Sequence, residues 1–121
     1  MNTSVLIVDD ETVTRHMLKM LLELSGFVID EAKDGLEALE KVKQRIPDAM
    51  ILDVMMPRLD GITTCERLRA NPDTADLFII MLSGGNDYDR GMEAGASLFM
   101  EKPMNADRLI HTLKSLPRHE L

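Results

Sequence analysis

The sequence is poor in cysteine and in aromatic side chains. Its 121 residues include one cysteine, no tryptophan, one tyrosine and three phenylalanines. A single cysteine excludes an intramolecular disulfide. A chain of this length does not need one, because it buries roughly two thirds of the surface that its unfolded form would expose. We therefore expect one domain over residues 1–121, with 117–121 as a tail or the start of a linker, in a reducing, cytoplasmic location.

Long apolar runs and an excess of basic residues are also absent. No apolar stretch approaches the roughly 18 residues that a membrane span requires, and the first residues lack the basic segment of a signal peptide. The formal net charge is −7 and the pI is about 4.9. We therefore expect no membrane association and no direct nucleic-acid binding, which needs a basic face. An acidic domain is better suited to a cation or a basic protein surface.

Five short apolar runs alternate with five segments of helical spacing. The runs predict strands at Ser4–Val8, Val28–Glu31, Ala49–Asp53, Phe78–Leu82 and Ser97–Met100. The intervening segments predict helices at Glu11–Leu24, Gly35–Arg45, Gly61–Ala70, Asp87–Ala94 and Asn105–Leu116. Strict alternation favours a doubly wound α/β fold, in which helices cover both faces of a parallel sheet. In such folds the functional crevice lies at the carboxyl ends of the strands.

Apolar spacing marks the helices, and Asn105 is a candidate N-cap of the last one. The apolar sets are Val13, Met17, Leu21 and Leu24 in the first helix; Leu36, Leu39, Val42 and Ile46 in the second; Ile62, Cys65 and Leu68 in the third; and Leu109, Ile110 and Leu113 in the fifth. The sets of the third and fifth helices are expected to face inward, which makes Cys65 a small core residue.

Polar residues stand where the predicted strands end. Asp9 and Asp10 follow the first strand, Asp53 ends the third, Ser83 follows the fourth and Lys102 comes just after the fifth. Because parallel strands end at the same edge of a sheet, these residues should converge there. The predicted site therefore holds three carboxylates, one hydroxyl and one ammonium group.

This combination suits a metal-assisted phosphoryl transfer. Clustered carboxylates raise one another's pKa unless a cation compensates, and Mg²⁺ prefers oxygen ligands. A zinc site would use His and Cys, but His16, His111 and His119 stand elsewhere in the pattern. A carboxylate beside Mg²⁺ can attack phosphorus, while Lys102 and Ser83 stabilise the phosphoryl oxygens. Taken singly, each of these residues is explained by an ordinary structural role in a turn or at a helix start. The hypothesis of phosphoryl transfer therefore depends on their joint placement at the strand ends.

Several motifs extend this set along the chain. They are Val8-Asp9-Asp10, Leu52-Asp53-Val54-Met55-Met56-Pro57 with Asp60-Gly61, Met81-Leu82-Ser83-Gly84, Glu93-Ala94-Gly95-Ala96 and Lys102-Pro103. In these motifs, and over essentially its whole length, the sequence resembles the receiver domain of two-component response regulators. The resemblance implies a flavodoxin-like (βα)5 sandwich with strand order 2-1-3-4-5.

The resemblance also implies roles for the residues at the strand ends. Asp53 would accept a phosphoryl group from a phosphohistidine of a sensor kinase or phosphotransfer protein. Mg²⁺, for which Mn²⁺ can substitute, would be bound by Asp53, by Asp10 directly, by Asp9 through water and by the backbone carbonyl of Met55. The domain would be a phosphoacceptor that assists its own phosphorylation and dephosphorylation, not an enzyme with an external substrate.

The remaining implied roles concern the response to phosphorylation. Lys102 would pair with the phosphoryl group, and its bond to Pro103 would be cis. Ser83 and Phe99 match the switch pair, whose movement would change the surface of helix 4, strand 5 and helix 5. A downstream effector domain or protein would read that surface, and a homodimer is allowed.

Two departures from the family pattern lead to further expectations. The segment from Ser83 to Gly95 is shorter than is usual in the family by roughly three residues, near one helical turn, and it opens with Gly84 and Gly85. We expect a mobile loop, a short fourth helix and an altered output surface, which puts in doubt any dimer built on a full fourth helix. Met55 and Gly85 occupy the positions that influence hydrolysis in the family, and neither side chain can orient a water. We therefore predict a slowly decaying phosphoryl state.

Other classes fit less well. A phosphatase of the haloacid dehalogenase type needs a carboxylate two positions after its nucleophile, where this chain has Met55. A flavodoxin-type flavin carrier needs a phosphate loop after the first strand, where Asp9 and Asp10 would repel phosphate. A receiver-like binding module that is not controlled by phosphorylation stays open as the alternative, although the complete set of polar residues argues against it.

Overall fold

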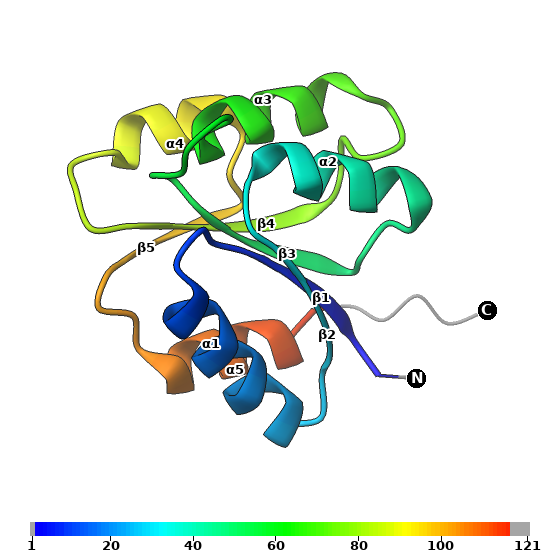
Figure 1. Ribbon diagram of the computed structural model, residues 1–121, viewed down its shortest axis with the longest axis vertical. Coiled ribbons are helices and arrows are strands. Elements are labelled where there is room, and N and C mark those ends of the chain that lie inside the picture. The colour runs from blue at the N-terminus through cyan, green and yellow to red at the C-terminus, as the bar shows by residue number, and fades with distance from the viewer. Residues whose placement is uncertain (1, 117–121) are drawn as a thin grey trace.

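The computed structural model describes residues 2–116, which form a five-stranded parallel sheet in the order β2-β1-β3-β4-β5 (Figure 1). The strands are β1 (Ser4–Val8), β2 (Val28–Ala32), β3 (Ala49–Asp53), β4 (Phe78–Ser83) and β5 (Leu98–Glu101). The helices are α1 (Thr12–Leu24), α2 (Gly35–Gln44), α3 (Gly61–Ala70), α4 (Tyr88–Ala94) and α5 (Ala106–Lys114). The predicted doubly wound fold and strand order are confirmed, while the predicted tail 117–121, with His119, lies outside the described residues.

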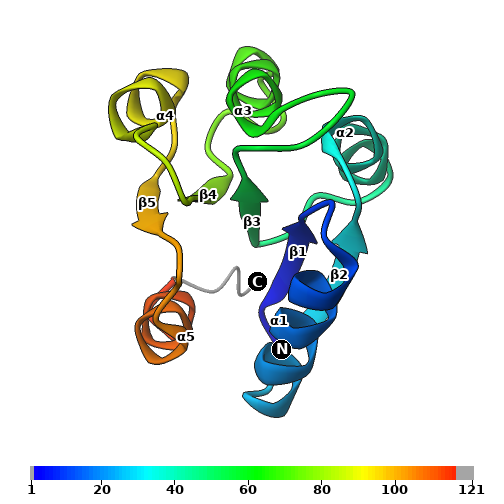
Figure 2. The same cartoon turned by 60° about the vertical axis from the view of Figure 1, so that its left-hand side comes forward.

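The helices form two layers, with α2, α3 and α4 on one face of the sheet and α1 and α5 on the other (Figures 1 and 2). Successive side chains of a strand point to opposite faces. Leu6 and Met50 therefore pack with the first layer, whereas Ile7 and Ile51 pack with the second. β3 lies in the middle of the sheet and is buried along its whole length. This explains why its sequence is a continuous apolar run.

Helix α1 forms where the sequence predicts it, but the apolar recurrence that marks it does not face the sheet. Val13, Met17, Leu21 and Leu24 are exposed by 70, 58, 39 and 81 %. The buried side chains are Leu18 and Leu22, one turn apart. Arg15 continues this face at i−3 from Leu18, and its guanidinium contacts the backbone of Asp9 and the side chain of Glu31. A charged residue thus interrupts the buried stripe and disguises it in the sequence.

The other helix faces agree with the sequence more closely. In α2 the buried residues include Ala38 and Val42, whereas Leu36 and Ile46 are 42 and 46 % exposed, so the predicted face is only partly correct. The inward faces predicted for α3 and α5 are confirmed, with Ile110 packed at the edge of the core and the others buried. Asn105 caps α5, because its side chain accepts a hydrogen bond from the amide of Arg108.

Helix α4 is short, as predicted, with seven residues from Tyr88 to Ala94. It ends at Gly95, whose φ of 109° is a left-handed conformation that favours glycine. Between residues 2 and 116, no helix combines the length and the apolar character that crossing a bilayer requires.

Candidate functional site

Three carboxylates meet at the carboxyl edge of the sheet. Each of Asp9, Asp10 and Asp53 offers an oxygen, and these oxygens all lie within 4.8 Å of one another. Asp9 and Asp53 are only 2 and 4 % exposed, whereas Asp10 is open to solvent. The structure therefore brings together the acidic residues that the sequence places at two separate strand ends.

The register of the sheet explains this meeting. Val8 of β1 pairs with Leu52 of β3, so the next residues, Asp9 and Asp53, leave the sheet side by side. Gly61 then lets α3 begin directly against β3, since a Cβ at that position would lie 2.2 Å from the carbonyl oxygen of Asp53. The glycine thus holds the loop after Asp53 close to the sheet.

Lys102 brings a positive charge to the same point. Its Nζ lies 3.1 Å from Oδ1 of Asp53 and 3.9 Å from Oδ2 of Asp9. Its backbone amide donates to the carbonyl of Ser83 at 2.9 Å, which ties the end of β5 to the end of β4. The peptide bond between Lys102 and Pro103 is cis.

The site holds more negative charge than its one lysine offsets. Burial raises the pKa of Asp53, and the hydrogen bond from Lys102 only partly opposes it. Burial likewise raises the pKa of Asp9, although the hydrogen bond from the amide of Glu11 and the charge of Lys102 act to lower it. Burial lowers the pKa of Lys102, but its hydrogen bond and ion pair with Asp53 outweigh that effect and raise it overall. Additional positive charge would stabilise the ionised carboxylates.

Ser83 ends β4 at the same edge and is 1 % exposed. Its hydroxyl donates to Oδ2 of Asp87 at 2.6 Å and accepts from the amide of Gly85 at 3.0 Å. Phe99, in β5, is half-buried and meets Tyr88 edge to face, with ring centroids 5.5 Å apart. Gly91 of α4 leaves room for the Phe99 ring, because a Cβ there would lie 3.0 Å from its Cδ2 atom.

His16, His111 and Cys65 lie outside this group, whereas the prediction for Met55 concerns its backbone carbonyl and not its side chain. The side chain of Met55, in the loop after β3, is directed to solvent, and the residue is 72 % exposed. Nε2 of His16 lies 3.4 Å from Oε1 of Glu31, and His111 is on α5. Cys65 is fully buried, and its thiol donates to the carbonyl of Ala94, which fits the predicted core role.

Sequence reasoning missed three side chains that support the edge. Arg15 donates to the carbonyl oxygen of Asp9 at 2.7 Å and to Glu31 at 3.1 Å, so it fixes the turn after β1. Arg58, at a φ of 66°, pairs with the buried carboxylate of Asp34. Asp87 binds the hydroxyl of Ser83. No local pattern indicates the contacts of Arg15 with Glu31 and of Arg58 with Asp34, because these partners are 16 and 24 residues apart in sequence. Asp9 and Ser83 are nearer in sequence to their partners Arg15 and Asp87, at six and four residues.

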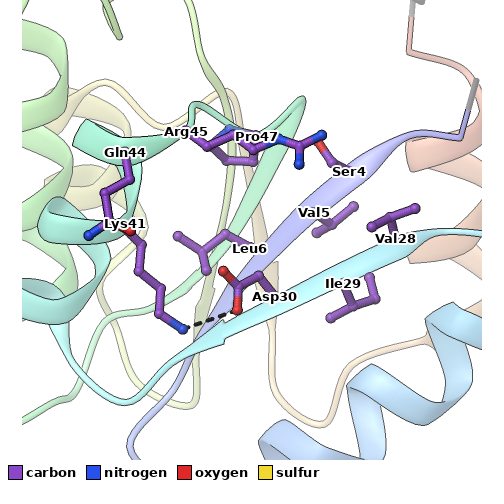
Figure 3. A pocket seen from close by; sticks show the side chains of 10 residues that line it. All are labelled: Ser4, Val5, Leu6, Val28, Ile29, Asp30, Lys41, Gln44, Arg45 and Pro47. Atoms are coloured by element: carbon purple, nitrogen blue, oxygen red, sulfur yellow. Dashed lines mark hydrogen bonds and ion pairs between the residues drawn. The ribbon is translucent and has the colours of Figure 1, made fainter.

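A separate cavity lies at the opposite end of the sheet, where strands β1 and β2 begin. Its volume is about 290 Å³, and it opens between β1, β2 and the end of α2 (Figure 3). Its one ion pair joins Lys41 to Asp30 at 3.0 Å. The cavity contains none of the site residues predicted from the sequence.

Comparison with known proteins gives a consistent result. Residues 5–114 match the family described as the response regulator receiver domain. The chain is 38% identical to the response regulator MprA of Mycobacterium ulcerans over 98% of its own length and 51% of the relative. It thus spans about half the length of the curated relatives that it matches first.

Solved structures resemble the fold over nearly all of its length. The chemotaxis protein CheY4 of Vibrio cholerae superposes with a TM-score of 0.89 at 30% identity, covering 97% of this chain and 100% of that one. The signal receiver domain of a signal transduction histidine kinase from Syntrophus aciditrophicus superposes with a TM-score of 0.89 at 29% identity. The match covers 98% of this chain and 97% of that one. The chain therefore belongs to the family of response regulator receiver domains of two-component systems.

Proposed function

We propose that this domain is a phosphorylation switch in which Asp53 accepts a phosphoryl group from a phosphohistidine. The observation that carries the proposal is the contact of 3.1 Å between Nζ of Lys102 and Oδ1 of Asp53, beside a second buried carboxylate. The arrangement supplies a nucleophile together with a cation for the oxygens of the incoming group.

The donor set fits Mg²⁺, or Mn²⁺ in its place. Asp9, Asp10 and Asp53 offer oxygen atoms only, and within residues 2–116 no histidine or cysteine joins them. Hard divalent cations prefer such ligands. With the backbone carbonyl of Met55, these residues would hold the ion. When bound, the ion would neutralise charge on the carboxylates and on the phosphoryl oxygens.

The residues of the chain then have distinct roles. An oxygen of Asp53 forms the new bond to phosphorus as the bond to the imidazole nitrogen breaks, and the nitrogen keeps the electron pair and takes up a proton from solvent. Lys102 passes from the Asp53 carboxylate to an oxygen of the transferred group. Ser83 donates its hydroxyl to another such oxygen, and Phe99 moves inward behind it. The surface of α4, β5 and α5 changes as a result.

We also propose partners and a cellular location for the domain. The phosphoryl donor is a sensor histidine kinase or a phosphotransfer protein, and a downstream effector domain or protein reads the α4-β5-α5 surface, in the cytoplasm and without direct nucleic-acid contact by this domain. We propose that the domain is not an enzyme, since its product is its own phosphorylated form. Met55, with no acidic group, supports a long-lived phosphoryl state. Complete decay within seconds would exclude such a state.

The test is intact-mass spectrometry after incubation with acetyl phosphate, with and without Mg²⁺. We expect a gain of one phosphoryl group that requires Mg²⁺, is lost in Asp53→Asn and persists in Asp76→Asn. Asp76 is an exposed carboxylate at the opposite end of the sheet, just before β4, and is the matched control. No gain in the wild-type protein under any condition would favour a receiver-like binding module that phosphate does not control.

A further inference from the structure

The hydroxyl of Ser83 already has a strong partner in this structure. It lies 2.6 Å from Oδ2 of Asp87, within the range of a charge-assisted O–H···O⁻ bond. The other carboxylate oxygen of Asp87 faces the guanidinium of Arg90 at 3.3 Å. The side chain of Asp87 is 15 % exposed, whereas that of Arg90 is 64 % exposed, so the contact with Ser83 is the better shielded of the two.

The Ser83 hydroxyl can donate only one hydrogen bond at a time. Serine has one O–H donor and two acceptor sites. In this structure the amide of Gly85 donates to one acceptor site of the hydroxyl, and Oδ2 of Asp87 accepts the hydroxyl's single hydrogen bond. Ser83 therefore cannot donate to a phosphoryl oxygen on Asp53 while it donates to Asp87. The two acceptors are both anionic, and they compete for one proton.

The local chain is built for this contact. Only Gly84, Gly85 and Asn86 separate Ser83 from Asp87. Gly85 passes close to both partners, since a Cβ on it would lie 3.3 Å from Oδ2 of Asp87 and 3.8 Å from Oγ of Ser83. Asp87 directly precedes α4, yet its carboxylate forms no capping hydrogen bond with that helix. Its bond to Ser83 thus links the end of β4 to the start of α4.

We propose that Asp87 is a positioning residue that holds the Ser83 hydroxyl in the unphosphorylated domain, and that the phosphoryl group must displace it. This inference rests on the proposed function of Asp53. Phosphorylation redirects the hydroxyl hydrogen bond of Ser83 from one anion to another and leaves Oδ2 of Asp87 without this donor. Because Asp87 lies at the start of α4, the exchange reaches the face that we propose as the output surface.

The experiment measures the affinity of the Mg²⁺-loaded domain for beryllofluoride, a mimic of the phosphoryl group, by isothermal titration calorimetry. Asp87→Ala removes the competing acceptor, so we expect binding about tenfold tighter, from the usual strength of a hydrogen bond to a charged group. In a Ser83→Ala background the same substitution should have no effect on affinity. Asp89→Ala is the matched control: Asp89 is an exposed carboxylate of α4 without a hydrogen bond or ion pair among residues 2–116.

The outcomes separate the two proposals. A wild-type domain that binds no beryllofluoride would overturn the proposed function, and the role of Asp87 with it. Equal affinity of wild type and Asp87→Ala would overturn the role of Asp87 alone. An equal gain in Asp89→Ala, or a gain that persists without the Ser83 hydroxyl, would show a general charge effect and have the same consequence.

A second measurement needs no variant of Asp87. The ¹³C chemical shift of its side-chain carboxylate reports the loss of a hydrogen-bond donor. We expect this signal to move when beryllofluoride is added to the wild-type domain and to stay in place in Ser83→Ala. An unchanged signal in a wild-type domain that has bound beryllofluoride would contradict the proposal.

Discussion

Asp34 and Asp53 are two buried carboxylates at the same edge of one sheet, and the fold treats them in opposite ways. Asp34 is 3 % exposed and Asp53 is 4 % exposed. Burial raises the pKa of both, but for Asp34 the amide of Glu37 and the guanidinium of Arg58 outweigh burial and lower it. For Asp53 the hydrogen bond from Lys102 does not suffice, and its pKa is raised.

The difference shows that burial alone does not identify a functional carboxylate. One oxygen of Asp34 accepts a hydrogen bond from the amide of Glu37 at 2.8 Å and caps α2, and the other accepts one from Nε of Arg58 at 2.9 Å. Both oxygens of this carboxylate therefore have partners within the fold. Within residues 2–116, Asp53 shares its one cationic partner, Lys102, with Asp9, and it lies beside Asp10. A carboxylate whose charge is incompletely compensated is available to an external cation or electrophile.

The largest effect expected from this comparison is on phosphorylation. Asp53→Asn should abolish Mg²⁺-dependent phosphorylation by acetyl phosphate, because the amide is not a nucleophile, while the fold persists. Asp34→Asn should be phosphorylated like the wild type. Intact mass and circular dichroism of the two variants provide the measurement. Loss of phosphorylation in both folded variants would remove the distinction between the two carboxylates.

The next effect is on stability. Asp34→Ala removes the N-cap of α2 and leaves Arg58 without its carboxylate, so we expect the free energy of unfolding to fall by about 1–2 kcal/mol. Urea denaturation would measure the change, with Asp76→Ala as the exposed control. A variant as stable as the wild type would show that the contacts of Asp34 add nothing to the fold.

The position of Asp53 beside Asp9 could be predicted from the sequence, but its electrostatic difference from Asp34 could not. Apolar runs place the strand ends, and a parallel sheet brings the residues after Val8 and Leu52 together. The compensation of each charge depends on Arg58 and Lys102, which lie 24 and 49 residues from Asp34 and Asp53 along the chain. Such long-range pairs leave no periodic signal in the sequence.

The buried face of helix α1 is a second feature that the sequence did not predict. Its apolar recurrence correctly indicates a helix, but the exposed Met17 and Leu24 belong to it and the buried Leu18 and Leu22 do not. The buried face includes Arg15, because that side chain serves the turn at Asp9. Helical periodicity therefore predicts the element well, and it predicts the packed face poorly where a charged residue supports the site.

A smaller effect of opposite sign is expected at Asp9. Burial raises its pKa, so its ionised form costs stability at neutral pH when no divalent cation is bound. Asp9→Asn retains an oxygen that can accept the amide of Glu11 and removes the charge. In EDTA we expect its free energy of unfolding to rise by about 1 kcal/mol. Thermal unfolding would measure this, and a loss of stability would mean that the 3.9 Å contact with Lys102 outweighs burial.

The smallest effect separates the charge of Asp34 from its capping oxygen. Asp34→Asn can keep the cap but loses the ion pair, and Arg58 is 54 % exposed, so we expect a loss of about 1 kcal/mol or less at pH 7. Because the folded-state pKa of Asp34 is lowered, its charge stabilises the fold above the unfolded pKa, about 3.9. This contribution disappears as the pH falls through the folded value.

Wild type and Asp34→Asn should therefore differ in stability at neutral pH and converge in acid, which urea denaturation between pH 7 and pH 3 would follow. Asp76→Asn, whose carboxylate is exposed, should parallel the wild type throughout. A gap between wild type and Asp34→Asn that is constant over this range would assign the whole effect to the geometry of the cap. The charge of Asp34 would then add no net stability, and the electrostatic contrast between the two carboxylates would lose its physical basis.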